Sequence, residues 1–280
     1  MNYRHAFHAG NFADLVKHAI VAAILRELTT GDPVTVIDTH AGAGLYDLAA
    51  EASRRTGEGE AGVGRLMADV GAPAAFDALK AAVGRINGDG AWRFYPGSPL
   101  LIAAALRPGD RYLAWEIRVD DCAALRRAAP WSSGVEVHQG DGWARAARVV
   151  PAAPAPTLVL IDPPYERGDD YVRAIALSRR VIGVNPRAVV AIWAPLKDLA
   201  TFDAFLGGIE DAAPGRGILS AQARLRPLTN PMRLNGCAMV VVNPTPHLSE
   251  NAQTVVDWIS NALGEVGALG RVDEMVAGRG

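Results

Sequence analysis

The stretch TLVLIDPPY, residues 157–165, decides the fold class of this chain. Four apolar residues follow Thr157 without the polar–apolar alternation typical of a strand with one wet face. Such a strand is expected to be buried on both faces, as in a parallel sheet that is covered by helices. The apolar run stops at Asp162, and two prolines and a tyrosine follow. In an open α/β sheet, ligands bind at this carboxyl end of the strands.

Further apolar runs of strand length occur along the chain, and helical patterns surround them. The predicted strands are Val34–Asp38, Arg111–Glu116, Val135–Gln139, Thr157–Asp162 and Ala188–Ala194. The predicted helices are Phe12–Leu28, Pro99–Leu106, Val119–Ala129, Asp170–Ile182 and Leu196–Leu206. This alternation predicts a doubly wound, Rossmann-like α/β sheet. Two more strands, Leu219–Arg226 and Cys237–Asn243, predict an antiparallel hairpin at the sheet edge, followed by a helix over Glu250–Leu263.

The connection after the first strand is longer than a simple α/β connection. Between Tyr46 and Trp92 there is no strand pattern, but there are helical stretches such as Pro73–Ile86. We therefore predict an inserted helical subdomain over residues 47–93, and a core formed by residues 1–46 and 94–280.

Composition restricts the classes of function. The chain has 280 residues, of which 50% are hydrophobic, a formal net charge of −2 and a pI of about 6.3. Because a nucleic-acid binder is usually basic, any contact with RNA or DNA must come from local patches. No apolar run approaches the roughly 18 residues of a membrane span, and the N-terminus does not resemble a signal peptide. We expect a cytoplasmic monomer whose two cysteines are reduced.

A glycine-containing loop, DTHAGAG at residues 38–44, follows the first strand. Glycines there let the backbone approach a nucleotide-like ligand. The loop departs from the G-x-G-x-x-G dinucleotide fingerprint, and no Gly-Lys-Ser/Thr follows for a P-loop. S-adenosylmethionine fits better because it carries no phosphate. A tight strand-to-helix turn stays open as the alternative.

Two more strand ends carry candidate ligands for such a cofactor. Glu116 ends the second strand, where an acid can accept hydrogen bonds from a ribose diol. Asp141 and Gly142 follow the third strand, and Asp141 could accept from an adenine amino group. The alternatives are an acid at a helix N-terminus for Glu116 and an Asp-Gly turn for Asp141.

The strand end at Asp162 combines three chemical groups. The Asp162 carboxylate and the Pro163 carbonyl, held rigid by the prolines, are two neighbouring acceptors. An exocyclic amine has two donors in one plane, and an exposed Tyr165 ring offers a face on which a base can stack. The alternative is a proline-rich turn. The set predicts that an aminopurine or aminopyrimidine binds here.

IDPPY resembles the catalytic motif of amino-group methyltransferases that act on adenine or cytosine. Together with YRHAFHAGNFADLVKH (residues 3–18), DTHAGAG and YPGSP (residues 95–99), it resembles one bacterial family along the whole chain. That family is the 23S ribosomal RNA adenine-N6 methyltransferases, which modify a single adenine, adenine 2030, of the large-subunit RNA.

This resemblance implies roles for particular residues. The cofactor-binding residues would be His18, His40, Ser98, Glu116, Asp141, Gly142 and Asp162. The catalytic residues would be Asp162, as the acid–base group, with Pro163 and Tyr165. Tyr3, Arg4 and Tyr165 would contact the RNA. S-adenosylmethionine would be the cofactor, S-adenosylhomocysteine the product and 23S rRNA the partner.

Other basic residues are also candidates for phosphate contacts. They are Arg216, Arg224, Arg226 and Arg233 near the predicted hairpin, Arg54, Arg55 and Arg65 in the predicted insertion, and Arg4, His5 and His8 in the N-terminal arm. A solvated face is the alternative for each of them. His5, His8 and His18 lie close in sequence, but neither cysteine nor clustered acid completes a zinc site, so no metal is predicted.

Four other functions compete, and the incomplete dinucleotide fingerprint disfavours one of them, a dinucleotide dehydrogenase. A DNA adenine-N6 methyltransferase would carry the same DPPY, although the chain has no second domain of the size that target recognition needs. A protein-glutamine methyltransferase usually has Asn at the Asp162 position. A SAM-binding, RNA-binding factor without catalysis would not need an intact DPPY.

Overall fold

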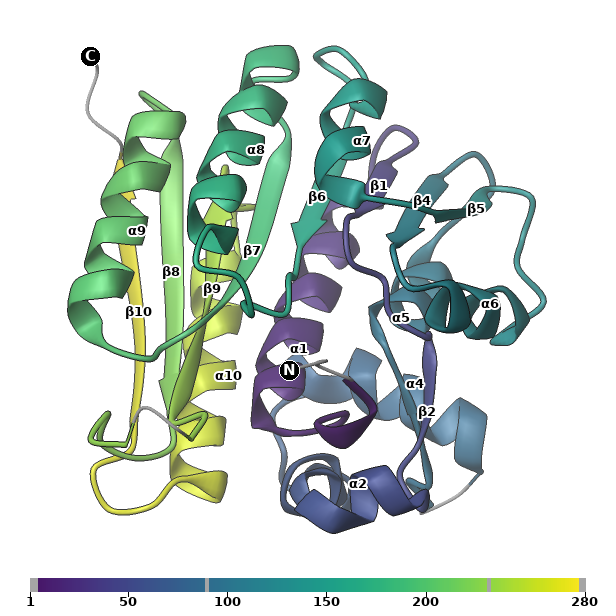
Figure 1. The fold of residues 1–280 in the computed structure, drawn as a ribbon, viewed down its shortest axis with the longest axis vertical. Coiled ribbons are helices and arrows are strands. Elements are labelled where there is room, and N and C mark those ends of the chain that lie inside the picture. Colours follow the sequence, from purple (N-terminus) through teal and green to yellow (C-terminus); the bar gives the residue numbers. More distant parts are fainter. Residues whose placement is uncertain (1–4, 89–90, 231–232, 277–280) are drawn as a thin grey trace.

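The fold is built on one large sheet (Figure 1), in a computed structural model that describes residues 5–88, 91–230 and 233–276. The strand order is β10-β8-β9-β7-β6-β1-β4-β5. The strands are β1 (Thr35–Asp38), β4 (Arg111–Glu116), β5 (Val135–Gln139), β6 (Thr157–Ile161), β7 (Val189–Pro195), β8 (Gly217–Arg224), β9 (Gly236–Val242) and β10 (Leu269–Val276). Neighbours from β5 to β7 pair in parallel, whereas β7 with β9, β9 with β8, and β8 with β10 pair antiparallel.

The predicted fold class is confirmed, with one difference at the edge of the sheet. The hairpin of β8 and β9 continues the sheet from β7, but β10 lies outside it as the outermost strand. The sequence LGRVDEMV did not predict a strand because it mixes charges and a glycine with few apolar residues. Its pairing with β8 over eight residues, not its own pattern, makes it extended.

Helices cover both faces of the sheet (Figure 1). One face carries α7 (Gly142–Val149), α8 (Asp170–Val184) and α9 (Leu199–Ala212), which share one apolar cluster with that side of the strands. The other face carries α1 (Phe12–Leu28), α5 (Ser98–Ala105) and α10 (Leu248–Leu263), and α6 (Val119–Arg127) follows β4. Within the described ranges, no helix combines the length and apolar character that crossing a bilayer requires.

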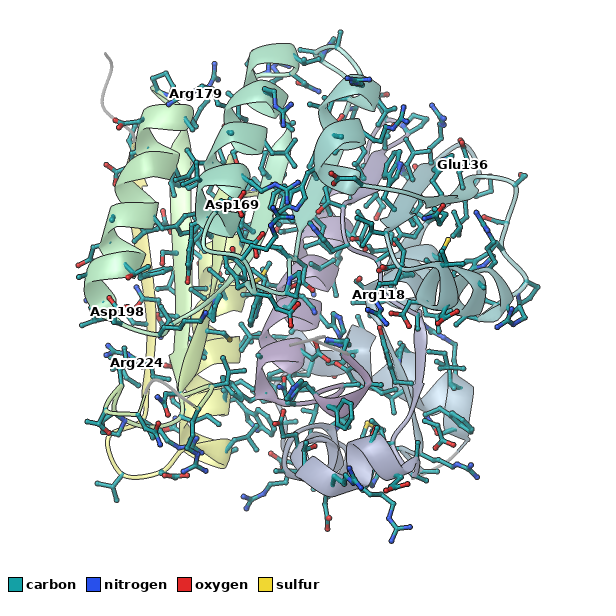
Figure 2. All side chains as sticks on the ribbon, in the orientation of Figure 1. Arg118, Glu136, Asp169, Arg179, Asp198 and Arg224 are labelled. Atoms are coloured by element: carbon teal, nitrogen blue, oxygen red, sulfur yellow. The ribbon has the colours of Figure 1, made fainter. Side chains whose placement is uncertain are left out.

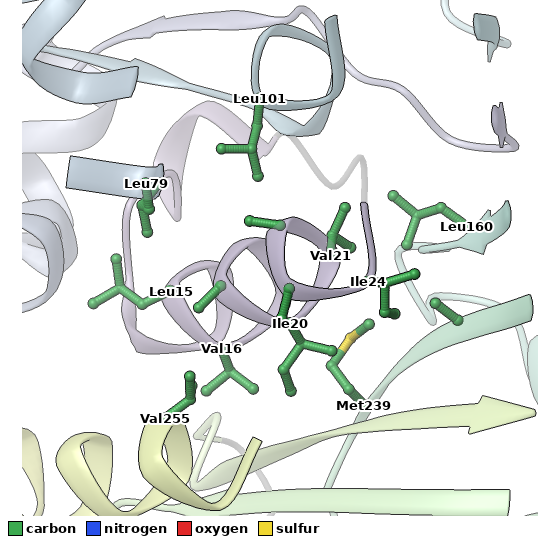
Figure 3. Packing of buried hydrophobic residues seen from close by; sticks show 14 of the residues in the cluster. Leu15, Val16, Ile20, Val21, Ile24, Leu79, Leu101, Leu160, Met239 and Val255 are labelled. Atoms are coloured by element: carbon green, nitrogen blue, oxygen red, sulfur yellow. The ribbon is translucent and has the colours of Figure 1, made fainter. Parts of the chain in front are cut away.

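The central helix of the second face is α1, which was predicted to the residue. Asn11 begins it, and its side-chain oxygen accepts hydrogen bonds from the backbone N–H groups of Ala13 and Asp14. Residues 12–25 of α1 are all buried, and apolar side chains cover most of the helix. Figure 3 shows its side chains between Leu79, Leu101, Met239 and Val255, which come from elements far apart in sequence.

The long connection after β1 contains the predicted helices. It runs between β2 (Leu45–Asp47) and β3 (Phe94–Pro96), which pair antiparallel at its two ends. Its helical pieces are α2 (Glu51–Thr56), the π-helical η2 (Glu60–Gly64), α3 (Arg65–Ala68), η3 (Ala74–Phe76) and α4 (Asp77–Asn87). Val63, Phe76 and Val83 belong to the same apolar cluster as α1. These helices thus share one apolar core with α1, and a separate subdomain over residues 47–93 stays a prediction.

Candidate active site

The carboxyl ends of β1, β4, β6 and β7 open into a cavity of about 1140 Å³. Its lining includes seven of the predicted site residues, namely His18, His40, Ser98, Glu116, Asp162, Pro163 and Tyr165. A ligand pocket typically measures about 300–1,000 Å³, so the volume can hold a cofactor and a nucleotide together. Figure 2 shows the side chains in this region around the labelled Arg118, which also lines the cavity.

The carboxylate of Asp162 is held by a lysine from α1. The Nζ atom of Lys17 lies 2.6 Å from Asp162 Oδ2 and 2.8 Å from Asp14 Oδ1. Lys17 and Asp14 are almost completely buried. Although burial disfavours the Lys17 cation, the charges of Asp14 and Asp162 hold the pKa of Lys17 well above its ordinary value. The lysine is therefore charged, and it fixes the orientation of the Asp162 carboxylate.

Asp14 is the anchor of this network. Its Oδ2 atom accepts hydrogen bonds from the backbone N–H of Gly10 at 2.9 Å and from the His5 ring at 3.0 Å. Burial opposes ionisation of Asp14, but the charges of His5 and Lys17 hold its pKa well below its ordinary value. The N-terminal segment is thus connected through Asp14 and Lys17 to the end of β6.

The prediction that the Tyr165 ring is exposed is wrong. Only 6% of the residue is exposed, and its ring centroid lies 4.6 Å from that of Tyr171 and 5.9 Å from that of Trp193. Its hydroxyl donates to the Trp193 carbonyl at 2.8 Å. A positive φ of 48° turns the backbone so that the ring packs into the α8 side of the core instead of facing outward. Tyr165 still contributes to the wall of the cavity.

His18 contributes a free hydrogen-bonding atom to the cavity wall. Its Nδ1 lies 2.7 Å from the hydroxyl of Tyr95, and the two rings are stacked. Burial, together with the neighbouring Lys17 charge, lowers the pKa of His18 to about 3, so the imidazole is neutral. Its Nε2 has no hydrogen-bond partner among the described residues. Because a buried polar atom is normally paired, this atom suits a ligand with a complementary polar group.

Ser98 and His40 are connected to neighbouring protein groups. Ser98 donates to Asp38 Oδ2 at 3.0 Å, and the same oxygen accepts from the Tyr112 hydroxyl. Burial raises the pKa of Asp38 to about 6. The His40 ring bonds Thr39 Oγ1 at 2.7 Å, and its pKa is lowered to about 3 by burial and by the charge of Arg173. Both predicted residues thus present fixed, neutral groups to the cavity.

Glu116 connects the second strand end to the glycine loop. Its carboxylate accepts from the backbone N–H groups of Gly42 at 2.9 Å and Arg118 at 2.7 Å. Gly42 has a φ of +66°, and a Cβ atom there would collide with the Tyr46 hydroxyl, so the loop requires glycine at this position. Burial raises the pKa of Glu116. Ile117, 60% exposed, lies beside it on the cavity wall as an apolar surface.

The structure places Asp141 apart from the other predicted residues. Its side chain accepts from the backbone N–H of Trp143 at 2.9 Å and so caps α7, and its Oδ2 lies 3.4 Å from Arg173. A Cβ on Gly142 would collide with the Thr39 carbonyl, so this glycine lets α7 approach the end of β1. Asp141 and Gly142 lie outside the described lining of the cavity.

The predicted RNA-contact residues fall into three groups. Tyr3 and Arg4 lie outside the described residues. His5, His8, Arg65, Arg226 and Arg233 line the cavity, whereas Arg54, Arg55, Arg216 and Arg224 are outside its described lining. Arg226 is paired with Glu265 at 2.7 Å.

Sequence reasoning missed Lys17, Asp14 and Asp38. The signal for the first two was present in FADLVKHAIVAAIL, where one acid and one lysine at i and i+3 interrupt an otherwise apolar helix. A charged pair on a helix with no solvent face requires a partner elsewhere. Among residues 5–88, 91–230 and 233–276, no group of three or more His, Cys, Asp or Glu side chains could hold a metal ion.

Comparison with known proteins identifies the family. The model of the family described as ribosomal RNA large subunit methyltransferase D, RlmJ, matches residues 31–275. The chain belongs to this family. It is 32% identical over 264 residues to ribosomal RNA large subunit methyltransferase J of Escherichia coli, covering 94% of each chain. It is 31% identical over 265 residues to the protein of the same name from Haemophilus influenzae, again covering 94% of each.

A solved structure has the same fold. The chain matches the crystal structure of a Legionella pneumophila protein with a TM-score of 0.87 and 24% identity, covering 95% of this chain and 98% of that one. This likeness supports the sheet and helix arrangement. Family membership confirms the predicted class of enzyme, a methyltransferase.

Proposed function

We propose that this enzyme transfers a methyl group from S-adenosylmethionine to the exocyclic N6 amine of one adenine in 23S ribosomal RNA. The observation that carries the proposal is the carboxylate of Asp162, fixed by Lys17 at the strand end inside a cavity large enough for two ligands. The RNA substrate is supported by membership in a family of ribosomal RNA methyltransferases.

The residues of the cavity fit the cofactor. The unpaired Nε2 atom of His18 would bind the polar end of the methionine moiety, with Ser98 beside it. Glu116 would accept from the ribose diol with its remaining lone pairs, and Ile117 would pack against the adenine. His40 would complete this wall, and Asp141 and Gly142 would border the adenine end. S-adenosylmethionine supplies an electrophilic methyl group when it is bound.

Asp162 and Pro163 would act on the amine. The lone pair of an adenine N6 atom is delocalised into the ring, so the amine is a weak nucleophile. Acceptance of its two N–H groups by the Asp162 carboxylate and the Pro163 carbonyl favours a pyramidal nitrogen. Positive charge grows on that nitrogen during transfer, and a preorganised carboxylate stabilises it. Asp162 then takes the proton that the nitrogen loses.

The substrate base must leave its stack to reach this site, at a cost of a few kcal/mol. Contact with the Tyr165 ring would offset part of that cost, on the order of 1–3 kcal/mol. Because the ring packs against Tyr171 and Trp193, stacking requires the segment of Tyr165 to shift. Tyr3 and Arg4 belong to the proposal as RNA contacts.

The proposal includes a monomeric enzyme that acts in the cytoplasm. A ribosomal RNA substrate supports the location. One cavity within one chain contains seven of the predicted site residues, which supports a monomer as the active form.

The test is methylation of unmodified 23S RNA by the purified protein with labelled S-adenosylmethionine, followed by nucleoside analysis. We expect the label in N6-methyladenosine, and a loss of roughly 10²–10⁴-fold in rate for Asp162→Asn. Asp203→Asn, at an exposed acid on α9, serves as the matched control and should keep the wild-type rate. Label in DNA or protein but not in RNA would refute the proposal.

A further inference from the structure

A second feature lies outside the catalytic cavity, on α7 and α8. These helices lie side by side on one face of the sheet (Figure 1) and carry five arginines, Arg145, Arg148, Arg173, Arg179 and Arg180. Four of them are exposed to solvent, and Arg173 is half-buried. α7 contains no acidic residue, and the one acid of α8, Asp170, is buried. The chain as a whole is slightly acidic, so this local excess of positive charge is unusual for it.

A depression of about 190 Å³ separates the two helices, and we call it the α7–α8 groove. Its lining is Asp141, Trp143, Ala144, Arg173, Ala176 and Arg180. The small side chains Ala144 and Ala176 leave space between the helices. Arg148 lies one helical turn beyond Ala144, on the same side of α7.

The guanidinium groups of the groove are held in place. The Arg173 guanidinium lies over the Trp143 ring, 4.9 Å from its centroid. Arg180 donates from Nη2 to the Trp143 carbonyl at 3.4 Å. Planar guanidinium groups have several fixed donors that match phosphate oxygens, and preorganisation reduces the entropy lost on binding.

Negative charges close to the groove balance only part of the positive charge of its arginines. Asp141 pairs with Arg173 at 3.4 Å. The acids of α9, Asp203, Glu210 and Asp211, belong to the helix that packs against α8, and Arg179 bonds the Asp211 carbonyl. Figure 2 shows Arg179 at the end of α8 that is away from Asp169. Arg148 and Arg180 have no ion pair within the described part of the chain.

The groove begins next to the catalytic cavity. Trp143 contacts the His40 ring at 4.8 Å between centroids, and His40 lines the cavity. The Arg173 guanidinium lies over the same indole. Both α7 and α8 start at the carboxyl edge of the sheet, after β5 and β6, so the groove runs from the catalytic edge toward the opposite edge.

We propose that the α7–α8 groove binds backbone phosphates of the substrate RNA, at nucleotides outside the catalytic cavity. This inference rests on the proposed function, because it places the same RNA on a second surface. Contacts of this kind position an RNA without reading its sequence. They also supply affinity that the overall charge of the chain cannot provide, because phosphate contacts release bound counterions.

The first test measures binding of a labelled 23S RNA fragment over a range of salt concentrations. The variant is Arg148→Ala/Arg180→Ala, and the matched control is Arg85→Ala/Arg127→Ala, at two exposed arginines on α4 and α6. We expect the groove variant to bind about tenfold more weakly or worse, with a salt slope smaller by roughly 1–2, because each lost phosphate contact removes close to one counterion. The control should match the wild type. Equal affinity and slope for the groove variant would overturn the inference.

A second test separates this inference from the proposed function. Methylation is measured on the long fragment and on a short oligonucleotide that carries only the nucleotides around the target. We expect the groove variant to lose kcat/KM on the long fragment and to keep the wild-type value on the short one. Wild-type protein that binds RNA through the groove but forms no N6-methyladenosine would refute the proposed reaction and leave the groove standing. An equal loss on both substrates would show that the arginines act on the catalytic site and would overturn the groove.

Discussion

At the scale of single residues, Lys17 links the N-terminal helix to the strand end at Asp162. It contacts Asp14 on its own helix and Asp162, 145 positions later in the chain. The buried ammonium group of Lys17 offsets the negative charge of the Asp14 carboxylate and contacts the Asp162 carboxylate at the same time. The carboxylate that would accept from the substrate amine is thus oriented before any ligand arrives.

Replacing Lys17 with methionine should therefore impair both stability and catalysis. The buried carboxylate of Asp14 and the half-buried carboxylate of Asp162 would lose their cation, so we expect the free energy of unfolding to fall by about 3–5 kcal/mol. The rate should fall by roughly 10-fold or more, because Asp162 would lose its fixed orientation. Urea denaturation and single-turnover methylation measure the two effects.

A second variant separates these effects. In Lys17→Met/Asp14→Asn, one of the uncompensated charges is gone, so part of the stability should return while the rate stays low. Recovery of the rate together with stability would mean that Lys17 acts only through folding.

The pKa of His18 predicts a pH dependence of stability. Its pKa in the folded protein is about 3, whereas an exposed histidine has a pKa of about 6.5. Below pH 6.5 the unfolded chain binds a proton that the folded chain does not, so stability is lost as the pH falls toward 3. This contribution has a slope of about 1.4 kcal/mol per pH unit.

We expect His18→Gln, without cofactor, to have a shallower loss of stability than the wild type between pH 6 and pH 4, by about that slope. Urea denaturation at several pH values measures it. Parallel pH profiles for the two proteins would contradict the assignment of a neutral, buried His18.

At the scale of elements, the π-helical segment η2 supports the N-terminal segment by backbone contact. The N–H of Val63 donates to the Gly10 carbonyl at 2.8 Å. A Cβ on Gly62 would collide with the same carbonyl oxygen and crowd Asn11, the cap of α1. The glycine is therefore required so that η2 can lie against the residues that lead into α1.

Gly62→Ala should destabilise the protein by on the order of 1–3 kcal/mol, because the backbone of the N-terminal segment must move. Gly84→Ala is the matched control. Its Cβ would meet nothing within 4 Å and it lies inside α4, so stability should rise by about 0.5–1 kcal/mol. Thermal unfolding measures both changes, and equal midpoints for the two variants would contradict the packing argument.

Local patterns predicted the elements well, and contacts between distant segments could not be predicted. The cap at Asn11 and the bounds of α1 follow from residues a few positions apart. The bond between Lys17 and Asp162 depends on how β6 meets α1, and no local pattern encodes that distance. The burial of Tyr165 likewise depends on Trp193, which lies on the neighbouring strand.

At the scale of the whole molecule, β10 closes the antiparallel side of the sheet. It covers the edge of β8 along its full length, and the residues of β8 are nearly all buried. Without β10, a long apolar edge would be open to pairing with other chains.

Truncation after Leu263 should therefore produce an aggregating protein, whereas removal of residues 277–280 alone should leave a protein that behaves as the full chain. Light scattering of both proteins, together with thermal unfolding, tests this. If the protein truncated after Leu263 is soluble and stable, the edge of β8 does not need β10 to prevent aggregation.

The position of α1 has a consequence for how the protein is made. α1 leaves the ribosome long before β9 and α10, against which its apolar sides pack. At about 5–20 residues per second, the helix waits roughly 10–50 s for these partners. During that interval a strongly apolar helix is exposed in the nascent chain, and it is a natural binding site for a chaperone.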